Sequence, residues 1–159
     1  MRKIIPILLM AMVMTACTNI DCPLNNLVRA NFILKSQNEK LEDTITVSAI
    51  RGALPDTVLF NRGINISNLQ VPVSYAQDVD RFQIQLRDSL DNIYIDTLTI
   101  TKTNQVHFEA VDCAPNYFHT ITQVVTTKHA IDSAVIKNPN IDYDTSKENI
   151  YIYFTNRSN

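Results

Sequence analysis

Residues 81–86 read RFQIQL, and this stretch decides the fold class because apolar and polar side chains alternate along it. Phe82, Ile84 and Leu86 occupy every second position, and the residues between them are glutamines. A period of two is typical of a β-strand with one buried face, whereas an amphipathic helix repeats every 3.6 residues. Residues 81–86 therefore predict a strand that packs one face against a core.

The same alternation recurs along most of the chain. It is found at 28–34 (VRANFIL), 44–50 (TITVSAI), 68–75 (NLQVPVSY), 94–101 (YIDTLTIT), 106–111 (VHFEAV), 117–127 (YFHTITQVVTT), 133–136 (SAVI) and 149–154 (NIYIYF). β-Branched and aromatic residues, which favour strands, fill these segments. Four Asp-Thr or Asp-Ser steps, in DTITV, DTVLF, DTLTI and DSAVI, are typical of a turn that leads into a strand.

Turns are predicted at residues 87–92, 101–105 and 136–149, which are rich in Asn and Asp. Because the chain has only two glycines, its reversals must rely on Asn and Asp, which tolerate left-handed backbone. About eight short strands separated by turns predict an all-β fold, an antiparallel β-sandwich of immunoglobulin-like type. A small β-barrel is the alternative, since alternation alone does not distinguish the two.

The first 16 residues have the composition of a secretory signal peptide. A basic start at Arg2 and Lys3 precedes an apolar segment that is too short to cross about 30 Å of hydrocarbon as a helix. Residues 14–17, MTAC, resemble the lipobox of bacterial lipoproteins. That resemblance implies cleavage before Cys17, acylation of Cys17 with palmitate-type chains, and stable membrane attachment. Simple secretion and a retained anchor are the alternatives.

If Cys17 carries lipid, Cys22 and Cys113 remain, and an even number of cysteines in an oxidising compartment predicts a disulfide. In the loop-entropy account, such a bond would contribute on the order of 4 kcal/mol. The alternative is two free, buried thiols.

Residues 17–26 are expected to form a lipidated linker, and 27–159 a single β domain. Removal of Arg2 and Lys3 lowers the 14 basic residues to 12 against 16 acidic ones, a formal net charge of −4. A mildly acidic chain without a basic patch argues against nucleic acid as a partner.

The three histidines and one acid could in principle form a zinc site, from His107, His119, His129 and Asp112. No two of them have the close spacing of zinc ligands, so surface or turn histidines are the favoured interpretation.

Residues 140–146 concentrate oxygen ligands at alternate positions: Asn140, Asp142, Asp144 and Ser146. A calcium loop of the EF-hand type would then require Gly and Glu where this chain has Thr145 and Tyr151. A hairpin loop with Asx turns is therefore favoured over an irregular calcium site, and no metal or cofactor is predicted.

No catalytic constellation is evident. A G-x-S-x-G segment is absent, and Cys113, although it follows Asp112, has a predicted disulfide partner. The carboxylate pairs Asp78/Asp80 and Asp88/Asp91 fall in expected turns, where solvated loop residues are the ordinary explanation. We therefore expect a protein that is not an enzyme.

Several motifs resemble an uncharacterised lipoprotein family of Bacteroidetes-type bacteria. They are Cys17, Cys22, Asp112-Cys113, the IDS of 131–133, the NP of 138–139 and the ENIYIYF of 148–154. The resemblance implies an outer-membrane location and no known activity. Because only one acidic residue, Asp21, follows Cys17 before Cys22, we expect the periplasmic face.

Together these features predict a lipid-anchored cell-envelope β-domain that acts as a non-enzymatic interaction or structural module. Its expected partners are the membrane, through its lipid, and an envelope protein. The alternative function is binding of a small ligand or divalent cation, through residues 140–146 or an aromatic face of Tyr117, Tyr151 and Tyr153.

Overall fold

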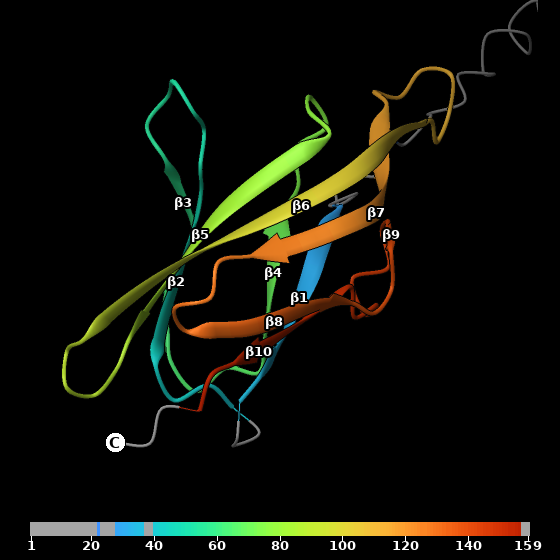
Figure 1. Cartoon of the computed structure of the whole chain (residues 1–159). Coiled ribbons are helices and arrows are strands. Elements are labelled where there is room, and N and C mark those ends of the chain that lie inside the picture. Colours follow the sequence, from blue (N-terminus) through green and yellow to red (C-terminus); the bar gives the residue numbers. More distant parts are fainter. Residues whose placement is uncertain (1–21, 23–27, 37–39, 157–159) are drawn as a thin grey trace, which may run out of the picture.

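The computed structural model describes residue 22 and residues 28–36 and 40–156 (Figure 1). The predicted signal peptide, Cys17 and most of the predicted linker lie outside this part of the chain. The described residues contain strands, turns and loops, and none of them forms a helix long and apolar enough to cross a membrane.

Ten strands form two sheets that face each other (Figure 1). The four-stranded sheet has the order β4-β1-β10-β8 and consists of β1 (Arg29–Lys35), β4 (Asn68–Pro72), β8 (Ile131–Ile136) and β10 (Ile150–Phe154). The six-stranded sheet has the order β3-β2-β5-β6-β7-β9 and consists of β2 (Thr44–Ala49), β3 (Thr57–Gly63), β5 (Val79–Arg87), β6 (Ile93–His107), β7 (Asn116–Thr126) and β9 (Asn140–Ile141). Every pair is antiparallel except β1–β10, which is parallel, so the predicted antiparallel sandwich is confirmed with one exception.

The core lies between the sheets and is built from alternate residues of their strands. Phe82, Ile84 and Leu86 are each at most 2% exposed, as the alternation in residues 81–86 predicts. The Phe82 ring meets that of Phe32, on the opposite sheet, edge to face with centroids 5.8 Å apart. This geometry is favourable for aromatic pairs, and it joins the two sheets at the centre of the core.

The longest strand differs from the prediction. Residues 101–105 were predicted to be a turn, but β6 continues through them and pairs with β7 as far as His107 opposite Asn116. The pairing register shifts between Thr101 and Lys102, which is a β-bulge. The predicted turn is therefore wrong: residues 101–105 all pair with β7, and the chain reverses only after His107.

The residues that form the turns agree better with the prediction than this strand does. Asn65 and Asp91 have left-handed φ values of 55° and 64°, as expected for a chain with few glycines. Arg62 shares this conformation at 54°, which its residue type does not predict. In the turn after β5, the Asp88 carboxylate accepts hydrogen bonds from the backbone N–H groups of Leu90 and Asn92.

A buried carboxylate fastens the connection from β7 to β8, where the chain passes from one sheet to the other. The Oδ1 atom of Asp96 accepts bonds from Thr127 Oγ1 and His129 N, and its Oδ2 from the backbone N–H groups of Ala130 and Ile131. Burial alone would raise the pKa of Asp96, but these hydrogen bonds prevail and hold that pKa below its ordinary value.

The structure joins Cys22 to Cys113 by a disulfide, with their Cα atoms 5.6 Å apart, as the cysteine count predicts. Cys113 lies in the turn between β6 and β7, so the bond attaches the segment that precedes β1 to the end of this long hairpin.

Candidate functional site

The loop of residues 73–78 crosses from β4 in the four-stranded sheet to β5 in the six-stranded sheet. Two hollows adjoin this loop, and Val73 lines both of them. The first is also lined by Tyr75 and His119, and the second by Asp80 and Phe82. The loop is held by an unusual set of buried polar side chains from β5, β6 and β7.

Lys102 is the centre of this set, and its side chain is entirely buried. Its Nζ atom donates hydrogen bonds to the backbone oxygens of Ser74 and Gln77, at 2.5 and 2.6 Å, and to Asn104 Oδ1 at 3.1 Å. The Oδ2 atom of Asp80 lies 3.3 Å from the same nitrogen. A buried ammonium group is tolerated only when it is paired and hydrogen-bonded, and here both conditions are met.

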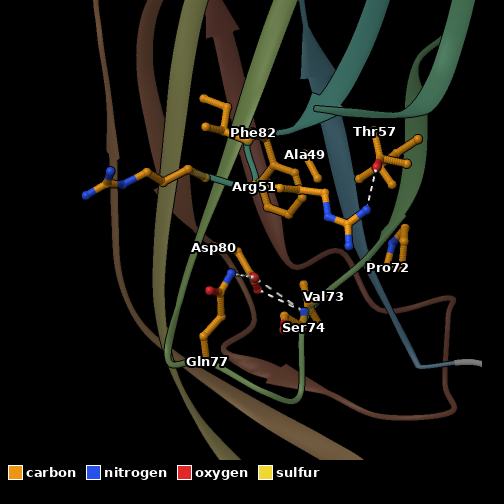
Figure 2. A pocket seen from close by; sticks show the side chains of 12 residues that line it. Ala49, Arg51, Thr57, Pro72, Val73, Ser74, Gln77, Asp80 and Phe82 are labelled. Atoms are coloured by element: carbon orange, nitrogen blue, oxygen red, sulfur yellow. Dashed lines mark hydrogen bonds between the residues drawn. The ribbon is translucent and has the colours of Figure 1, made fainter. Parts of the chain in front are cut away.

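Asp80 holds the same loop from the side of β5. Its carboxylate accepts a hydrogen bond from the backbone N–H of Ser74 at 3.1 Å and from Gln77 Nε2 at 3.3 Å (Figure 2). The loop is thus bound at its carbonyl groups by Lys102 and at its N–H group by Asp80. Such satisfied polar networks make the local structure rigid.

Asn104 and His119 extend the network toward the surface. Asn104 Nδ2 donates to Gln77 O and Asp78 Oδ1, which fixes the orientation of its amide. Asn104 Oδ1 therefore faces His119 Nδ1, at 2.7 Å, and must accept the bond. The proton of neutral His119 is consequently on Nδ1, and Nε2 is the unprotonated nitrogen.

His119 remains uncharged at neutral pH. Burial, with a further contribution from the nearby Lys102 charge, lowers its pKa to about 4. Nε2 has no hydrogen-bond partner among the described residues, and His119 lines the first hollow. This nitrogen is therefore a hydrogen-bond acceptor available to a molecule in the hollow.

The first hollow has a volume of about 440 Å³. Its wall includes the rings of Tyr75 and Tyr117, which stack with centroids 4.9 Å apart and an interplanar angle of 18°. The remaining lining residues are Val28, Val73, Pro115, Asn116 and His119. Aromatic faces beside one acceptor nitrogen suit an uncharged ligand that carries hydroxyl or amide donors.

The second hollow, of about 280 Å³, is lined by residues of β2 to β5 and of the same loop (Figure 2). Phe82 forms part of its apolar lining, and Arg51 lies at its edge, where Nη1 donates to Thr57 Oγ1 at 3.1 Å. Asp80 also lines this hollow, but its hydrogen bonds to Ser74 and Gln77 already occupy the carboxylate. The cationic residues that line this hollow are Arg51 and Arg81.

The structure does not bring the three histidines together. His107 stacks on Phe118 and lies 3.1 Å from Glu109, His119 is buried in the loop network, and His129 lies beside Asp96. Within the part of the chain that the structure describes, no three His, Cys, Asp or Glu side chains are placed to hold a metal ion.

The predicted oxygen cluster at residues 140–146 has Asx-turn geometry. Asp142 Oδ1 accepts from Asp144 N, and Asp144 Oδ1 accepts from Ser146 N. The other oxygen of Asp142 accepts from Lys147 Nζ at 2.5 Å, so a lysine already neutralises this carboxylate. Residues 137–149 connect β8 to β10, which pair antiparallel with Ile136 opposite Ile150, so the expected hairpin loop with Asx turns is confirmed. Within this loop, Asn140 belongs to β9, which pairs with β7 of the other sheet.

The predicted aromatic face is divided between the sheets. Tyr117 is on β7 and stacks on Tyr75, whereas Tyr151 and Tyr153 are on β10. The latter two rings are 6.4 Å apart, and Lys35 Nζ lies 4.4 Å from the centre of the Tyr151 ring. The ring partner of Tyr117 is therefore Tyr75, which the sequence did not indicate.

Two carboxylates of the expected turns differ in their surroundings. Asp88 is a turn residue, as predicted, but Asp80 belongs to β5 and is 5% exposed. The sequence reasoning also missed Lys102, although a signal for it exists. Leu98, Ile100 and Lys102 are two residues apart, so the alternation of β6 places this lysine on the inward face.

Cys113, the one candidate nucleophile, is consumed by the disulfide with Cys22. Cys17, the predicted lipidation residue, lies outside the described residues.

Comparisons with known proteins identify a single family. A family of unknown function, DUF6452, matches residues 44–154, which include β2 to β10 and all the network residues from Ser74 to His119. No curated protein and no solved structure matches the chain. The match covers more than half of the sequence, and the chain belongs to this family of unknown function.

Proposed function

We propose that this protein is a lipid-anchored β-domain of the cell envelope that acts as a non-enzymatic interaction module at the periplasmic face of the outer membrane. The disulfide between Cys22 and Cys113 carries the proposal. It accounts for both cysteines that remain once Cys17 is acylated, and disulfides persist in oxidising compartments outside the cytosol. The lipobox-like MTAC at residues 14–17 supplies the site of acylation.

The loop network supports an interaction role rather than catalysis. The charges of Lys102 and Asp80 are used to hold residues 74–77, and His119 is neutral, so these groups are not arranged to exchange protons with a substrate. Their effect is to fix the loop that carries Tyr75, which is 65% exposed. Rigid presentation of an exposed aromatic side chain lowers the entropic cost of binding a partner.

Acylation is tested by intact mass and fractionation of the protein produced in a lipoprotein-processing bacterium. The wild-type protein should begin at Cys17, carry acyl chains and remain with membranes. Cys17→Ser should lose the acyl mass and leave the membrane fraction, whereas the control Cys22→Ser should keep the acyl mass. A wild-type protein with an intact leader in the cytosol would disprove the proposal.

Partner binding is tested by crosslinking in intact envelopes, followed by mass spectrometry of the recovered proteins. We expect the same protein to be recovered with the wild type and with Tyr153→Ala, but not with Tyr75→Ala. Equal recovery with all three would exclude the loop as the contact, and recovery of no envelope protein would exclude an interaction module.

A second candidate function, small-ligand binding, is favoured by the unprotonated Nε2 of His119, which has no hydrogen-bond partner among the described residues and belongs to a residue that lines the first hollow. Thermal-shift measurements with monosaccharides and disaccharides would test it. A saturable stabilisation should disappear in Tyr117→Ala and persist in Tyr153→Ala, which removes an aromatic ring from the other sheet. No shift with any sugar would rule out a carbohydrate ligand.

A further inference from the structure

The end of the β6–β7 hairpin exposes apolar side chains. Phe108 is 61% exposed and Val111 is 98% exposed, and Val106, at 47%, lies on the adjoining part of β6. Val111 occupies the corner of a tight turn, which Cys113 N closes by donating to Ala110 O at 3.1 Å. Single exposed apolar residues are ordinary, but three at one projecting tip call for an explanation.

The position of the disulfide limits how far this tip can be from the membrane. Cys22 and Cys113 have Cα atoms 5.6 Å apart, and Cys17 precedes Cys22 by only five residues. A fully extended chain covers at most about 3.6 Å per residue, so the Cα atoms of Cys17 and Cys22 are within about 18 Å of each other. An acylated Cys17 therefore holds the hairpin tip near the lipid surface.

We propose that the tip docks on the membrane and that Phe108 and Val111 insert into the interface of a zwitterionic lipid bilayer beside the acyl anchor. This inference rests on the proposed acylation of Cys17. The tip is well suited to insertion because its apolar side chains project at a turn, and aromatic and aliphatic side chains partition into the boundary between headgroups and acyl chains.

The charge of the tip identifies the kind of lipid. Glu109 and Asp112 flank Val111, and His107 pairs with Glu109 at 3.1 Å. Two carboxylates disfavour an anionic surface, which attracts basic residues instead. Zwitterionic headgroups impose no such penalty, so phosphatidylethanolamine or phosphatidylcholine is the expected contact.

Docking would also orient the candidate site. Pro115 and Asn116, which follow the tip directly, line the first hollow together with Tyr75 and His119. The hairpin and the 73–78 loop lie at the same end of the molecule (Figure 1). The hollow would therefore open close to the membrane surface, while the β5–β6 turn would point away from it.

Tryptophan fluorescence tests the inference directly, because the natural chain contains no tryptophan. The full acylated protein with Val111→Trp is reconstituted into phosphatidylcholine vesicles that contain lipids brominated high on the acyl chain. Leu90→Trp is the matched control: Leu90 is 71% exposed in the turn at the other end of β6. That strand of 15 residues separates the two probes by roughly 45 Å.

We expect Trp fluorescence from Val111→Trp to shift to shorter wavelength and to be quenched by the brominated lipid, and that from Leu90→Trp to remain unquenched. Vesicle flotation and intact mass are recorded on the same samples. If the protein floats and carries acyl chains but the position 111 probe stays in water, the docking inference fails and the anchor stands. If the protein is not acylated and does not float, the proposed function and this inference both fail.

Discussion

The Nζ atom of Lys102 lies 3.3 Å from the Oδ2 atom of Asp80, and both side chains are buried at the end of the sandwich where β4 crosses to β5. This pair couples the two sheets through the loop between those strands, because Lys102 also binds the backbone oxygens of Ser74 and Gln77. The pair is therefore a polar connection between the core and the candidate site.

Replacement of Lys102 by methionine should lower the free energy of unfolding by about 3–5 kcal/mol, because it leaves the buried Asp80 carboxylate and the Ser74 carbonyl group without their cationic partner, while Gln77 O keeps only its bond from Asn104 Nδ2. Urea denaturation followed by circular dichroism measures this loss. Arg87→Met is the control, since its exposed pair with Asp91 should contribute no more than about 1 kcal/mol.

A double variant, Lys102→Met with Asp80→Leu, tests the mechanism of that loss. It removes both charges, so it should be more stable than Lys102→Met alone. It should not reach wild-type stability, because the backbone N–H and carbonyl groups of Ser74 remain unpaired and Gln77 O keeps only its bond from Asn104 Nδ2. Equal stability of all variants would show that the pair does not hold the loop.

The sequence predicts the strands of this fold better than it predicts the polar core. Alternation in residues 81–86 and 28–34 identifies β5 and β1, because their inward positions are apolar. The same logic fails at residues 101–105, where polar residues are typical of a turn in sequence but form part of β6. Composition cannot distinguish a polar side chain that bonds inside the protein from one that faces water.

Other features depend on contacts between distant parts of the chain. The two-residue strand β9 exists because it pairs with β7, and the parallel alignment of β1 with β10 brings together residues more than 100 positions apart. Neither follows from local pattern. The stacking of Tyr75 on Tyr117 is likewise a consequence of the loop network, so the sequence indicated Tyr117 but not its partner.

Acid should weaken the fold in two separate ranges of pH, and His119 governs the first. Its pKa is about 4 in the folded protein and about 6.5 when unfolded, so the unfolded chain binds the proton more readily between these values. Stability should therefore fall as pH drops from about 6.5 to 4, by at most about 3 kcal/mol, with solvent access through the hollow reducing this figure.

The measurement is urea denaturation at intervals across that range. His119→Gln should abolish most of the slope, because glutamine does not titrate, whereas the control His129→Gln should keep it. A slope that persists unchanged in His119→Gln would contradict the assignment of a buried, neutral histidine.

Asp96 should govern the second range. Its pKa is lowered in the folded protein, so its contribution is complete above the ordinary carboxylate pKa and is lost as pH falls through the lowered value. At neutral pH, Asp96→Asn should lower the free energy of unfolding by about 3 kcal/mol. The reason is that the amide NH₂ group would face backbone N–H donors that now meet a carboxylate oxygen.

The matched variant is Asp132→Asn, whose side chain accepts a single bond from Ser133 at the surface and should have little effect. The free energy of unfolding is measured by urea denaturation at pH 7 and at pH 3. Between these two pH values, Asp96→Asn should lose less stability than the wild type. Equal losses in the two proteins would show that Asp96 does not titrate differently on folding.

The disulfide should contribute to stability independently of the lipid. It closes a loop across 91 positions, and the loop-entropy account assigns such a crosslink on the order of 4 kcal/mol. Cys22→Ser/Cys113→Ser should therefore melt at a lower temperature than the wild type, and a reductant should lower the wild-type melting temperature to a similar value. Cys17→Ser should melt like the oxidised wild type, because Cys17 has no part in the bond. If a reductant left the wild-type melting temperature unchanged, the disulfide would make no measurable contribution to stability.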